Sequence, residues 1–330
     1  MPARDPRKLR PRRAALAAGT AVTALLATGC ASNDAPEAEY RADGTIRVVV
    51  AMAAGGGSDR SARAVSGALN GNDAGYSTVV ENREGGGGAV GWSYFYGLAG
   101  EPQHLLVAET ALHTLPRQEG VDLPFTYEDF TPIGMFAEDS RLVVAPADSP
   151  YDSCAELIEA SADEQLFSGV SGTYGADGMV LTRLEQAGLE ANRVPFGSSG
   201  EVVTAMLGGL LDLAPASAAS VKGYIESGDF KGLCTLSEER IDDEVMGSIP
   251  TALEQGVENG TVLMWRGVLA PGDLSEQARD YWVEQLRKAV QQDAFADYME
   301  ADMLTPKELY GDEFAAYLDE YDEDIAGYFG

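Results

Sequence analysis

Two glycine-rich turns near the start of the chain constrain its fold more than any other feature. The first, Gly55–Gly57, follows an apolar stretch with strand character at residues 46–51, and the second, Gly85–Gly88, follows a similar stretch at residues 78–80. Each turn leads into a sequence with helical apolar spacing. A strand, a glycine turn and a helix leave unpaired backbone N–H groups at the positive end of a helix dipole, where a carboxylate or phosphate can bind. Because the carboxyl ends of parallel strands meet at one edge of a sheet, we interpret the two turns as halves of one anion-binding cradle.

The first 29 residues have the pattern of an export signal. Six of them are Lys or Arg, and all six precede an apolar, alanine-rich run at residues 14–27. Two small residues and Cys30 follow, a pattern that resembles a lipoprotein cleavage box, and the run is short for a membrane-spanning helix. We therefore predict removal of residues 1–29, lipidation of Cys30 and a disordered tether at residues 30–43. A pair of arginines before the run leaves the export route open between the Sec and twin-arginine pathways.

The chain is strongly acidic, which limits its partners. It has 23 Lys and Arg against 53 Asp and Glu, a formal charge of -30, and without the first 29 residues the charge is -35. Such a surface argues against nucleic acid and against anionic membranes as electrostatic partners. It also favours solubility, and it means that an anionic ligand needs local help from backbone dipoles and a few arginines.

Strand-like and helical stretches alternate along the rest of the chain, which indicates an α/β fold. Two further small-residue turns, at residues 169–175 and 197–200, each lie between a predicted strand and a predicted helix. We expect two lobes with a cleft between them: residues 44–142 with 268–330 form lobe 1, and residues 143–267 form lobe 2. Hinges are expected near residues 142–146 and 264–270. Other expected elements are strands at residues 105–108, 142–145, 193–196, 211–214, 230–236 and 265–271, helices at residues 59–69, 90–98, 153–162, 178–188, 201–207, 275–292, 293–301 and 312–325, and a loop at residues 116–129.

Two cysteines remain after the predicted cleavage, Cys154 and Cys234. In an oxidising, exported setting such a pair often forms a disulfide, and two buried thiols are the alternative, which the sequence leaves open. The chain has only two histidines, His104 and His113, which lie far from both cysteines in sequence and lack a metal-ligand pattern. Neither a Gly-Lys-Ser/Thr phosphate loop nor a nucleophile elbow with a credible histidine partner occurs. We expect no metal, no cofactor and no catalytic activity.

Eight short motifs occur along nearly the whole mature chain, from about Thr45 to Tyr328. They are the opening strand and turn Ile46–Gly56, Val80–Arg83, Phe130–Ile133, the turn at residues 169–175, Val194–Phe196, Leu207–Gly209, Pro250–Gly256 and Trp265–Gly267. In this order they resemble the extracytoplasmic substrate-binding receptors of tripartite tricarboxylate transporters, the Bug-type receptors. Each motif is weak alone, and eight in the same order are specific.

The resemblance implies a type II periplasmic-binding-protein fold, with two lobes that close on a small carboxylate. A membrane permease of one large and one small subunit would then take up the ligand. It also implies that backbone N–H groups of the first two glycine turns hold the carboxylate and that turns of the second lobe cover the rest. Two departures stand out: Ala51–Ala53 replaces a proline–aromatic–proline stretch, and Phe196–Ser198 replaces tyrosine, lysine and glycine. Arg266 is then expected to supply the positive charge that binds a second carboxylate of the ligand.

The expected ligand-binding residues come from the four turns and from one strand. They are Ala54, Gly55, Gly56, Gly57, Ser58, Asp59, Asn82, Gly86 and Gly87 in lobe 1, Thr173, Tyr174, Phe196, Ser198 and Ser199 in lobe 2, and Arg266. Purely structural roles are the alternative for several of them: tight turns for the glycines, a helix cap for Ser58 and a first-turn acid for Asp59. We predict a monomeric, lipid-anchored receptor that captures a small di- or tricarboxylate for uptake. The alternatives are a receptor for an amino acid or aromatic acid, and a sensor that presents its ligand to a signalling partner.

Overall fold

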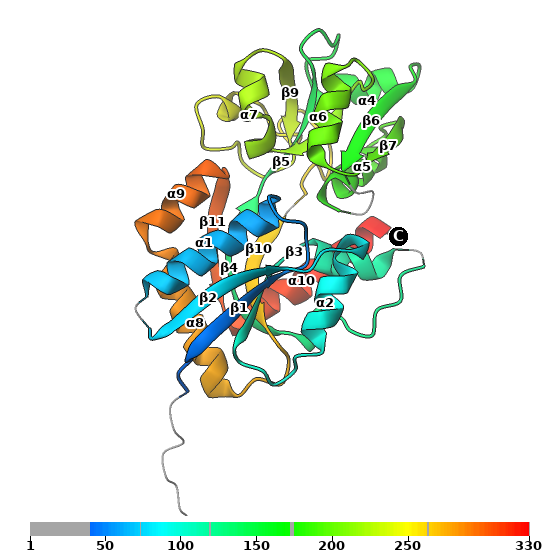
Figure 1. Ribbon diagram of the computed structural model, residues 1–330. Helices are drawn as coiled ribbons and strands as arrows, with labels where there is room; N and C mark the ends of the chain where they lie inside the picture. The colour runs from blue at the N-terminus through cyan, green and yellow to red at the C-terminus, as the bar shows by residue number, and fades with distance from the viewer. Residues whose placement is uncertain (1–39, 73, 119, 172–174, 263, 330) are drawn as a thin grey trace, which may run out of the picture. The chain divides into compact units, whose positions relative to one another are not determined.

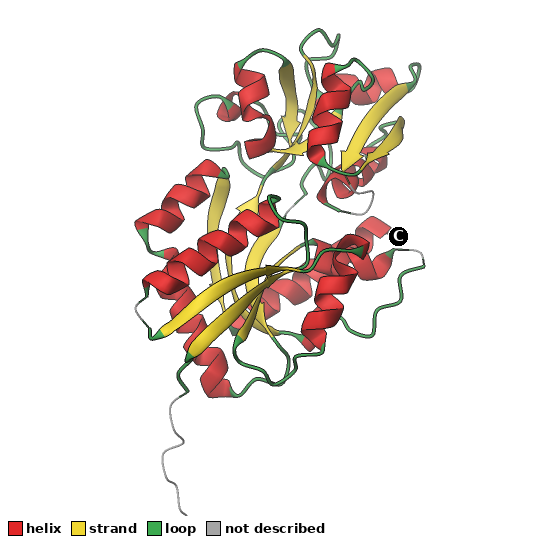
Figure 2. Ribbon diagram, in the orientation of Figure 1, coloured by secondary structure: helices red, strands yellow, loops and turns green. Residues whose placement is uncertain are grey.

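The computed structural model describes residues 40–72, 74–118, 120–171, 175–262 and 264–329. The predicted signal peptide, Cys30, most of the predicted tether, Thr173 and Tyr174 lie outside these residues. Strands and helices alternate through the described part, as an α/β fold requires (Figures 1 and 2). None of the described helices is both long enough and apolar enough to cross a membrane.

Six strands form the larger sheet, in the order β11-β4-β10-β3-β1-β2. Their bounds are β1 (Gly44–Val50), β2 (Tyr76–Asn82), β3 (His104–Glu109), β4 (Thr131–Asp139), β10 (Trp265–Ala270) and β11 (Leu304–Tyr310). β1 pairs in parallel with both β2 and β3, whereas β10 runs antiparallel to β3 and β4, and β11 antiparallel to β4. The carboxyl ends of β1, β2 and β3 therefore lie side by side at one edge of the sheet, and the two glycine turns follow β1 and β2 at this edge.

Successive residues of the larger sheet face two different apolar cores, as the period of two in a strand requires. Val48 and Val50 belong to the core that helices α1, α8 and α9 cover, whereas Val49 and Leu106 belong to the core that α2 and α10 cover. The bounds of these helices are α1 (Gly57–Gly71), α2 (Ala89–Tyr96), α8 (Glu276–Val290), α9 (Asp293–Ala301) and α10 (Asp312–Phe329). Because both faces are covered, the strands read as nearly continuous apolar runs.

The remaining strands form a three-stranded sheet, β8-β5-β9, and a parallel pair, β6-β7. Their bounds are β5 (Arg141–Pro146), β6 (Leu166–Ser171), β7 (Ala191–Phe196), β8 (Ala214–Ser217) and β9 (Phe230–Thr235), with helices α4 (Cys154–Ser161), α5 (Ala176–Gln186), α6 (Ser199–Leu207) and α7 (Ala218–Glu226). The structure joins Cys154 to Cys234 in a disulfide that ties α4 to β9, with the two Cα atoms 5.7 Å apart. As expected for an N-cap, the Ser153 hydroxyl accepts a hydrogen bond from the Glu156 N–H group.

The chain passes between the two groups of strands at two places. β4 ends at Asp139 in the larger sheet and β5 begins at Arg141 in the three-stranded sheet, close to the expected boundary after residue 142. The return comes before Trp265, three residues earlier than expected, because Trp265–Gly267 already pair with β4. The two crossing segments lie side by side, since the Asp139 N–H group donates to the Met264 carbonyl at 2.8 Å.

Some local expectations differ from the structure. The strand expected at residues 211–214 is β8, which begins at Ala214, while Leu213 makes only an isolated bridge to Ser168. β11 and α7 were not expected at all, and β11 carries the Pro and the charged side chains that are typical of an edge strand. The expected loop at residues 116–129 contains parts of two 3₁₀ turns, Leu115–Arg117 and Tyr127–Asp129.

The end of the predicted tether also belongs to the folded domain. Ala42 is buried in the core under α1 and α8, and the ring of Tyr40 packs edge-on against the ring of Tyr281 at a centroid distance of 5.4 Å. An aromatic side chain and a buried alanine supply the apolar contact that a free tether lacks, so residues 40–43 are not part of a tether.

Candidate functional site

The segments that lead into the two glycine turns contact each other at the carboxyl edge of the larger sheet. The side-chain amide of Asn82 donates to the Met52 carbonyl at 3.2 Å, and the Arg83 N–H group donates to the Val50 carbonyl at 2.7 Å. Gly91 in the first turns of α2 packs so closely on the end of β1 that an added Cβ would lie 2.5 Å from the Cα of Ala51. The proximity that the strand pattern predicted is therefore present.

Asp59 holds the first turn in shape. Its buried carboxylate accepts hydrogen bonds from the Gly55 N–H group at 2.9 Å, from the Asn82 side chain at 3.0 Å and from Arg63 at 2.9 and 3.1 Å. Burial opposes ionisation, yet these hydrogen bonds keep the pKa of the Asp59 carboxyl below its ordinary value. Asp59 and Asn82 fix the loop, and neither lies in the wall of the cavity described below.

Backbone N–H groups are available at both turns. The described residues offer no acceptor to the N–H groups of Gly56, Gly57 and Ser58 at the start of α1, or to those of Gly86 and Gly87 before α2. In the second turn Gly85 to Gly88 all have positive φ, between 59° and 135°, which only glycine adopts without strain. This turn therefore requires its glycines for its backbone path as well as for close approach of a ligand.

A cavity of about 330 Å³ lies between elements of the two strand groups. Its wall includes the ends of β3 and β10, the short helix α3 (Ala111–Thr114), the two crossing segments and the starts of α5 and α6. The volume is at the lower end of the range for small-molecule sites, about 300–1,000 Å³. The cavity is therefore matched to a ligand of metabolite size.

Only part of the predicted site reaches this cavity. Gly87, Ser199 and Arg266 line it, whereas the other described candidates do not. Ser58 is buried, and Ser198 caps α6 by accepting a hydrogen bond from the Glu201 N–H group. Phe196 packs on the core of the three-stranded sheet. The remaining described candidates outside the cavity wall are Ala54, Gly55, Gly56, Gly57, Asp59, Asn82 and Gly86.

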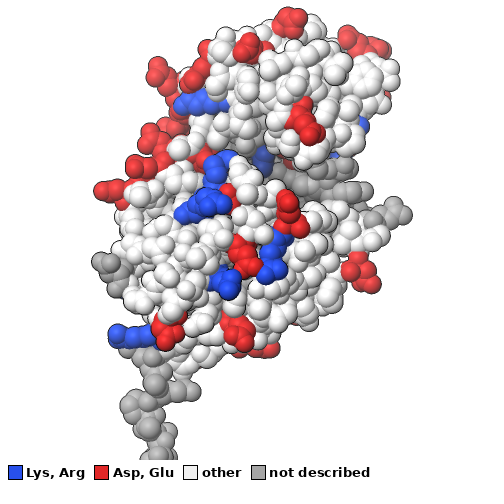
Figure 3. All heavy atoms as spheres, in the orientation of Figure 1, with Lys and Arg blue, Asp and Glu red and all other residues white. Residues whose placement is uncertain are grey.

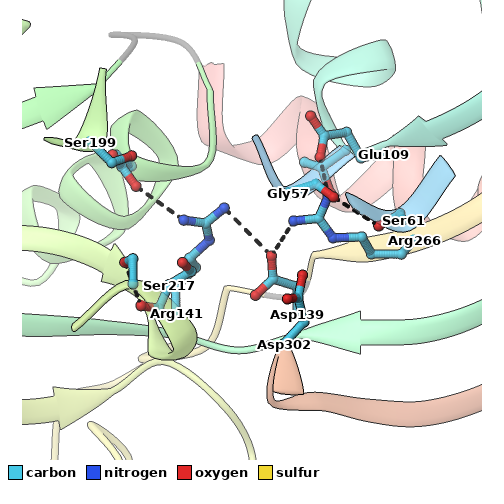
Figure 4. Close-up of polar contacts among 12 residues, drawn as sticks. Gly57, Ser61, Glu109, Asp139, Arg141, Ser199, Ser217, Arg266 and Asp302 are labelled. Carbon is cyan, nitrogen blue, oxygen red and sulfur yellow. Dashed lines mark hydrogen bonds and ion pairs between the residues drawn. The ribbon is translucent and has the colours of Figure 1, made fainter. Parts of the chain in front are cut away.

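Five ionisable side chains form a continuous row along the cavity wall, which we call the charge chain: Glu109, Arg266, Asp139, Arg141 and Asp177. Figure 4 labels the first four of them. Arg266 donates to Glu109 at 2.7 Å and to Asp139 at 2.5 Å. On the other side of Asp139, Arg141 lies 3.6 Å away and donates to Asp177 at 3.3 Å. The charge chain thus connects the end of β3, through the first crossing segment, to the start of α5.

Most of the charge chain is buried, so its charges depend on one another. The exposed fractions of the Asp139, Asp177 and Arg266 side chains are 5%, 4% and 7%. Burial opposes the charge of Asp139, but Arg141 and Arg266 hold the pKa of its carboxyl below the ordinary value. Burial raises the pKa of the Asp177 carboxyl in spite of Arg141. Burial also works against the charge of Arg266, and its acidic partners nevertheless raise the pKa of its guanidinium.

Arg266 lies directly beside the first glycine turn. A Cβ added at Gly57 would lie 2.9 Å from Nη2 of Arg266, so the lack of a side chain at position 57 makes room for the guanidinium. The guanidinium therefore stands next to the start of α1, at the place where the sequence predicted the carboxylate of a ligand.

Two arginines of the cavity wall, Arg141 and Arg266, each have a buried Nε that lacks an acceptor among the described residues. The indole N–H group of Trp265 also lacks one, but this side chain is fully buried and packs against His113 and Phe314 in the apolar core. Two hydroxyl groups, those of Ser171 and Ser199, lie 3.1 Å apart in the same wall. The wall is rich in donors and suits a ligand rich in acceptors.

The sequence pointed to only one member of the charge chain, Arg266. The other four are scattered over three segments, and nothing local distinguishes them from surface charges. One signal was available: Asp139 and Arg141 flank Ser140 just before the hinge expected near residues 142–146, next to the apolar run of β5. Charged residues at that position are unusual for a buried crossing and could have marked the site.

Neither a metal-binding group nor a basic surface patch accompanies the cavity in the described part of the chain. In the part of the chain that the structure describes, no three His, Cys, Asp or Glu side chains are grouped so that they could hold a metal ion. Acidic and basic side chains are interspersed on the viewed face (Figure 3), and several form ion pairs, such as Arg63 with Asp59 and Arg47 with Glu81. The donors of the cavity therefore act locally, within an acidic surface.

The fold and the cavity define a class of protein. Two groups of α/β elements joined by two crossing segments, with a ligand cleft between them, are the architecture of a type II periplasmic binding protein. The sequence model of one protein family, the tripartite tricarboxylate transporter family receptor, matches residues 62–320. The chain therefore belongs to this family. The fold and the family that the sequence motifs predicted are thus confirmed.

Individual relatives agree with the assignment. Protein BugT of Bordetella pertussis is 27% identical over 271 residues, which are 79% of this chain and 81% of that protein. The structure of the periplasmic binding protein BugD has a TM-score of 0.75 at 23% identity and covers 87% of this chain and 96% of its own. MatC from Rhodopseudomonas palustris with bound malate has a TM-score of 0.75 at 21% identity and covers 87% and 99%. The family consists of extracytoplasmic solute-binding receptors rather than enzymes.

Proposed function

We propose that the protein is the lipid-anchored receptor of a tripartite tricarboxylate-type transporter and that its cavity holds a small organic acid for delivery to a membrane permease. The observation that carries this proposal is the unpaired N–H group of Gly87 in the cavity wall, together with the guanidinium of Arg266 and the hydroxyls of Ser171 and Ser199 in the same wall. The family assignment and the malate bound in MatC support an acid as the ligand class.

The carboxylate binds to the N–H group of Gly87, at the positive end of α2. Gly87 lies in the cavity wall, so its N–H group is within reach of a ligand there. Ser171 and Ser199, from the other strand group, cover the ligand with their hydroxyls. Closure takes place by rotation about the two crossing segments, at residues 139–141 and near residue 264, and presents the closed form to the permease.

The anchoring part of the proposal rests on the sequence alone. Signal peptidase removes residues 1–29, and the lipid on Cys30 holds the receptor at the cell membrane after export by the Sec or twin-arginine route. In a fractionation experiment the Cys30→Ser variant should move from the membrane fraction to the soluble exported fraction. A variant that stays with the membrane would contradict lipidation.

A thermal-shift screen tests the ligand class. Mono-, di- and tricarboxylates and amino acids are added at millimolar concentration, and the melting temperature is recorded. A ligand at about 100 times its Kd stabilises the folded state by about 2.7 kcal/mol, which raises the melting temperature of a domain of 150–250 residues by about 5–10 °C. Flat melting curves across the whole panel would overturn the proposal.

A matched pair of variants locates the site. Gly87 and Gly209 have similar positive φ values, 65° and 70°, so alanine costs similar backbone strain at both. Only Gly87 lines the cavity, and an alanine Cβ there would lie 3.5 Å from Leu115, whereas nothing lies within 4 Å at Gly209. Gly87→Ala should therefore lose most of the rise in melting temperature that the ligand causes, and Gly209→Ala should keep this rise.

A further inference from the structure

The charge balance of the cavity wall differs from that expected for a site that takes a polycarboxylate. The charge chain contains three carboxylates, Glu109, Asp139 and Asp177, and two guanidiniums, Arg141 and Arg266. With all five ionised, it carries one net negative charge. Both arginines already have carboxylate partners within the protein. A ligand carboxylate that approaches either arginine therefore also meets a protein carboxylate of the same sign.

Glu109 is the most accessible member of the charge chain. Its side chain is 23% exposed, whereas those of Asp139 and Asp177 are 5% and 4% exposed. It accepts the hydrogen bond from Arg266 through Oε2, and Oε1 makes no hydrogen bond with the described residues. A carboxylate has about four acceptor positions, so Glu109 offers free acceptor capacity to the cavity.

A second observation points to a ligand in the same wall. The N–H group of Gly87, which lines the cavity, has no acceptor among the described residues. The cavity wall thus combines an unpaired backbone donor, which suits a carboxylate, with one accessible carboxylate, which suits a cation. A ligand that has both groups satisfies both parts of the wall.

We propose that the ligand is a small organic acid that also carries an ammonium group, and that Glu109 determines this specificity by accepting hydrogen bonds from the ammonium. The N–H group of Gly87 in the second glycine turn holds the carboxylate of the same ligand. This inference rests on the proposed function, because it assumes that the cavity is an acid-binding site. It narrows the ligand class from organic acids in general to amino acids and related zwitterions.

Calorimetric titration with matched acids tests the inference without any mutation. Each pair differs by one ammonium group: alanine and propionate, aspartate and succinate, glutamate and glutarate, 4-aminobutyrate and butyrate. We expect the tightest ligand of the panel to carry the ammonium and to bind at least tenfold more tightly than its partner. If succinate, glutarate or another acid without an ammonium binds as tightly as its partner or more tightly, this inference fails and the proposed function stands. If no acid binds at all, the proposed function fails as well.

Variants of Glu109 test the assigned residue. Glu109→Gln keeps the shape and removes the charge, and Arg266 keeps Asp139 as a partner. In the pair that contains the tightest ligand, the wild type should prefer the acid with the ammonium. We expect Glu109→Gln to reduce this preference at least tenfold, mainly by weakening the binding of the acid with the ammonium. Glu109→Asp, which keeps the charge, should retain part of the preference. Glu128→Gln, the same change at an exposed position outside the cavity wall, should leave the preference unchanged. A preference that survives Glu109→Gln would overturn the role of Glu109.

Discussion

Replacement of Asp139 by asparagine removes the central charge of the charge chain with almost no change in volume. The Asp139 side chain is 5% exposed and lies between Arg141 and Arg266, at 3.6 and 2.5 Å. A neutral amide at this position would leave both guanidiniums without their shared partner, and removal of one partner from a buried ion pair costs about 3–5 kcal/mol. Since a domain of 150–250 residues loses about 2–4 °C per kcal/mol, the melting temperature should fall by about 6 °C or more.

Differential scanning calorimetry of the wild type and two variants provides the comparison. Glu284→Gln is the control, because Glu284 pairs with Lys288 and the two side chains are 54% and 56% exposed. An exposed pair contributes only about 0–1 kcal/mol, so this variant should melt within a few degrees of the wild type. If the melting temperature of Asp139→Asn equals that of the wild type, the charge chain does not stabilise the folded protein at the two crossing segments.

A double variant and a pH series test the physical reason for the loss. In the Asp139→Asn variant the Arg266 guanidinium has already lost one partner. Arg266→Gln should therefore lower the free energy of unfolding less in this variant than in the wild type. The pKa of the Asp139 carboxyl is lowered in the folded state against the charge penalty of burial. Its contribution to stability is therefore fully present above its unfolded pKa of about 3.9 and is lost as the pH falls through the lower folded value. Asp139→Asn should lack this part of the acid denaturation.

Three other predictions follow from the fold. Reduction of the Cys154–Cys234 disulfide, which closes a loop of 80 residues, should cost about 4 kcal/mol in urea unfolding, and an unchanged midpoint would contradict it. Burial, partly offset by Asp322, lowers the pKa of His113, so stability should fall as the pH drops below the unfolded pKa of about 6.5. His113→Gln should remove that dependence between about pH 5 and 7 in thermal melts, and an identical slope would refute the assignment. Gly91→Val should cost about 1–3 kcal/mol or more, because its Cβ would meet the backbone of β1, and a melting temperature equal to that of the wild type would contradict the close packing.

The sequence by itself determined the features that short segments encode. Gly85 to Gly88 need positive φ, and the apolar spacing of residues 59–69 belongs to a helix, so the first two units of strand, glycine turn and helix could be recognised from their own residues. The parallel pairing of β1 with β2 and β3 then placed both glycine turns at one edge. The order of the motifs was sufficient for the family, since each is a local unit of the fold.

Only the tertiary structure decided which side chains meet. Arg266 and Glu109 are 157 residues apart in the chain, and their hydrogen bond exists because β10 inserts antiparallel between β3 and β4. The pairing of Cys154 with Cys234, left open by the sequence, depends in the same way on how α4 packs against β9. A turn is fixed by the backbone angles of a few neighbouring residues, whereas a buried charge is fixed by partners from distant segments. For that reason the position of the two glycine turns could be predicted and the composition of the charge chain could not.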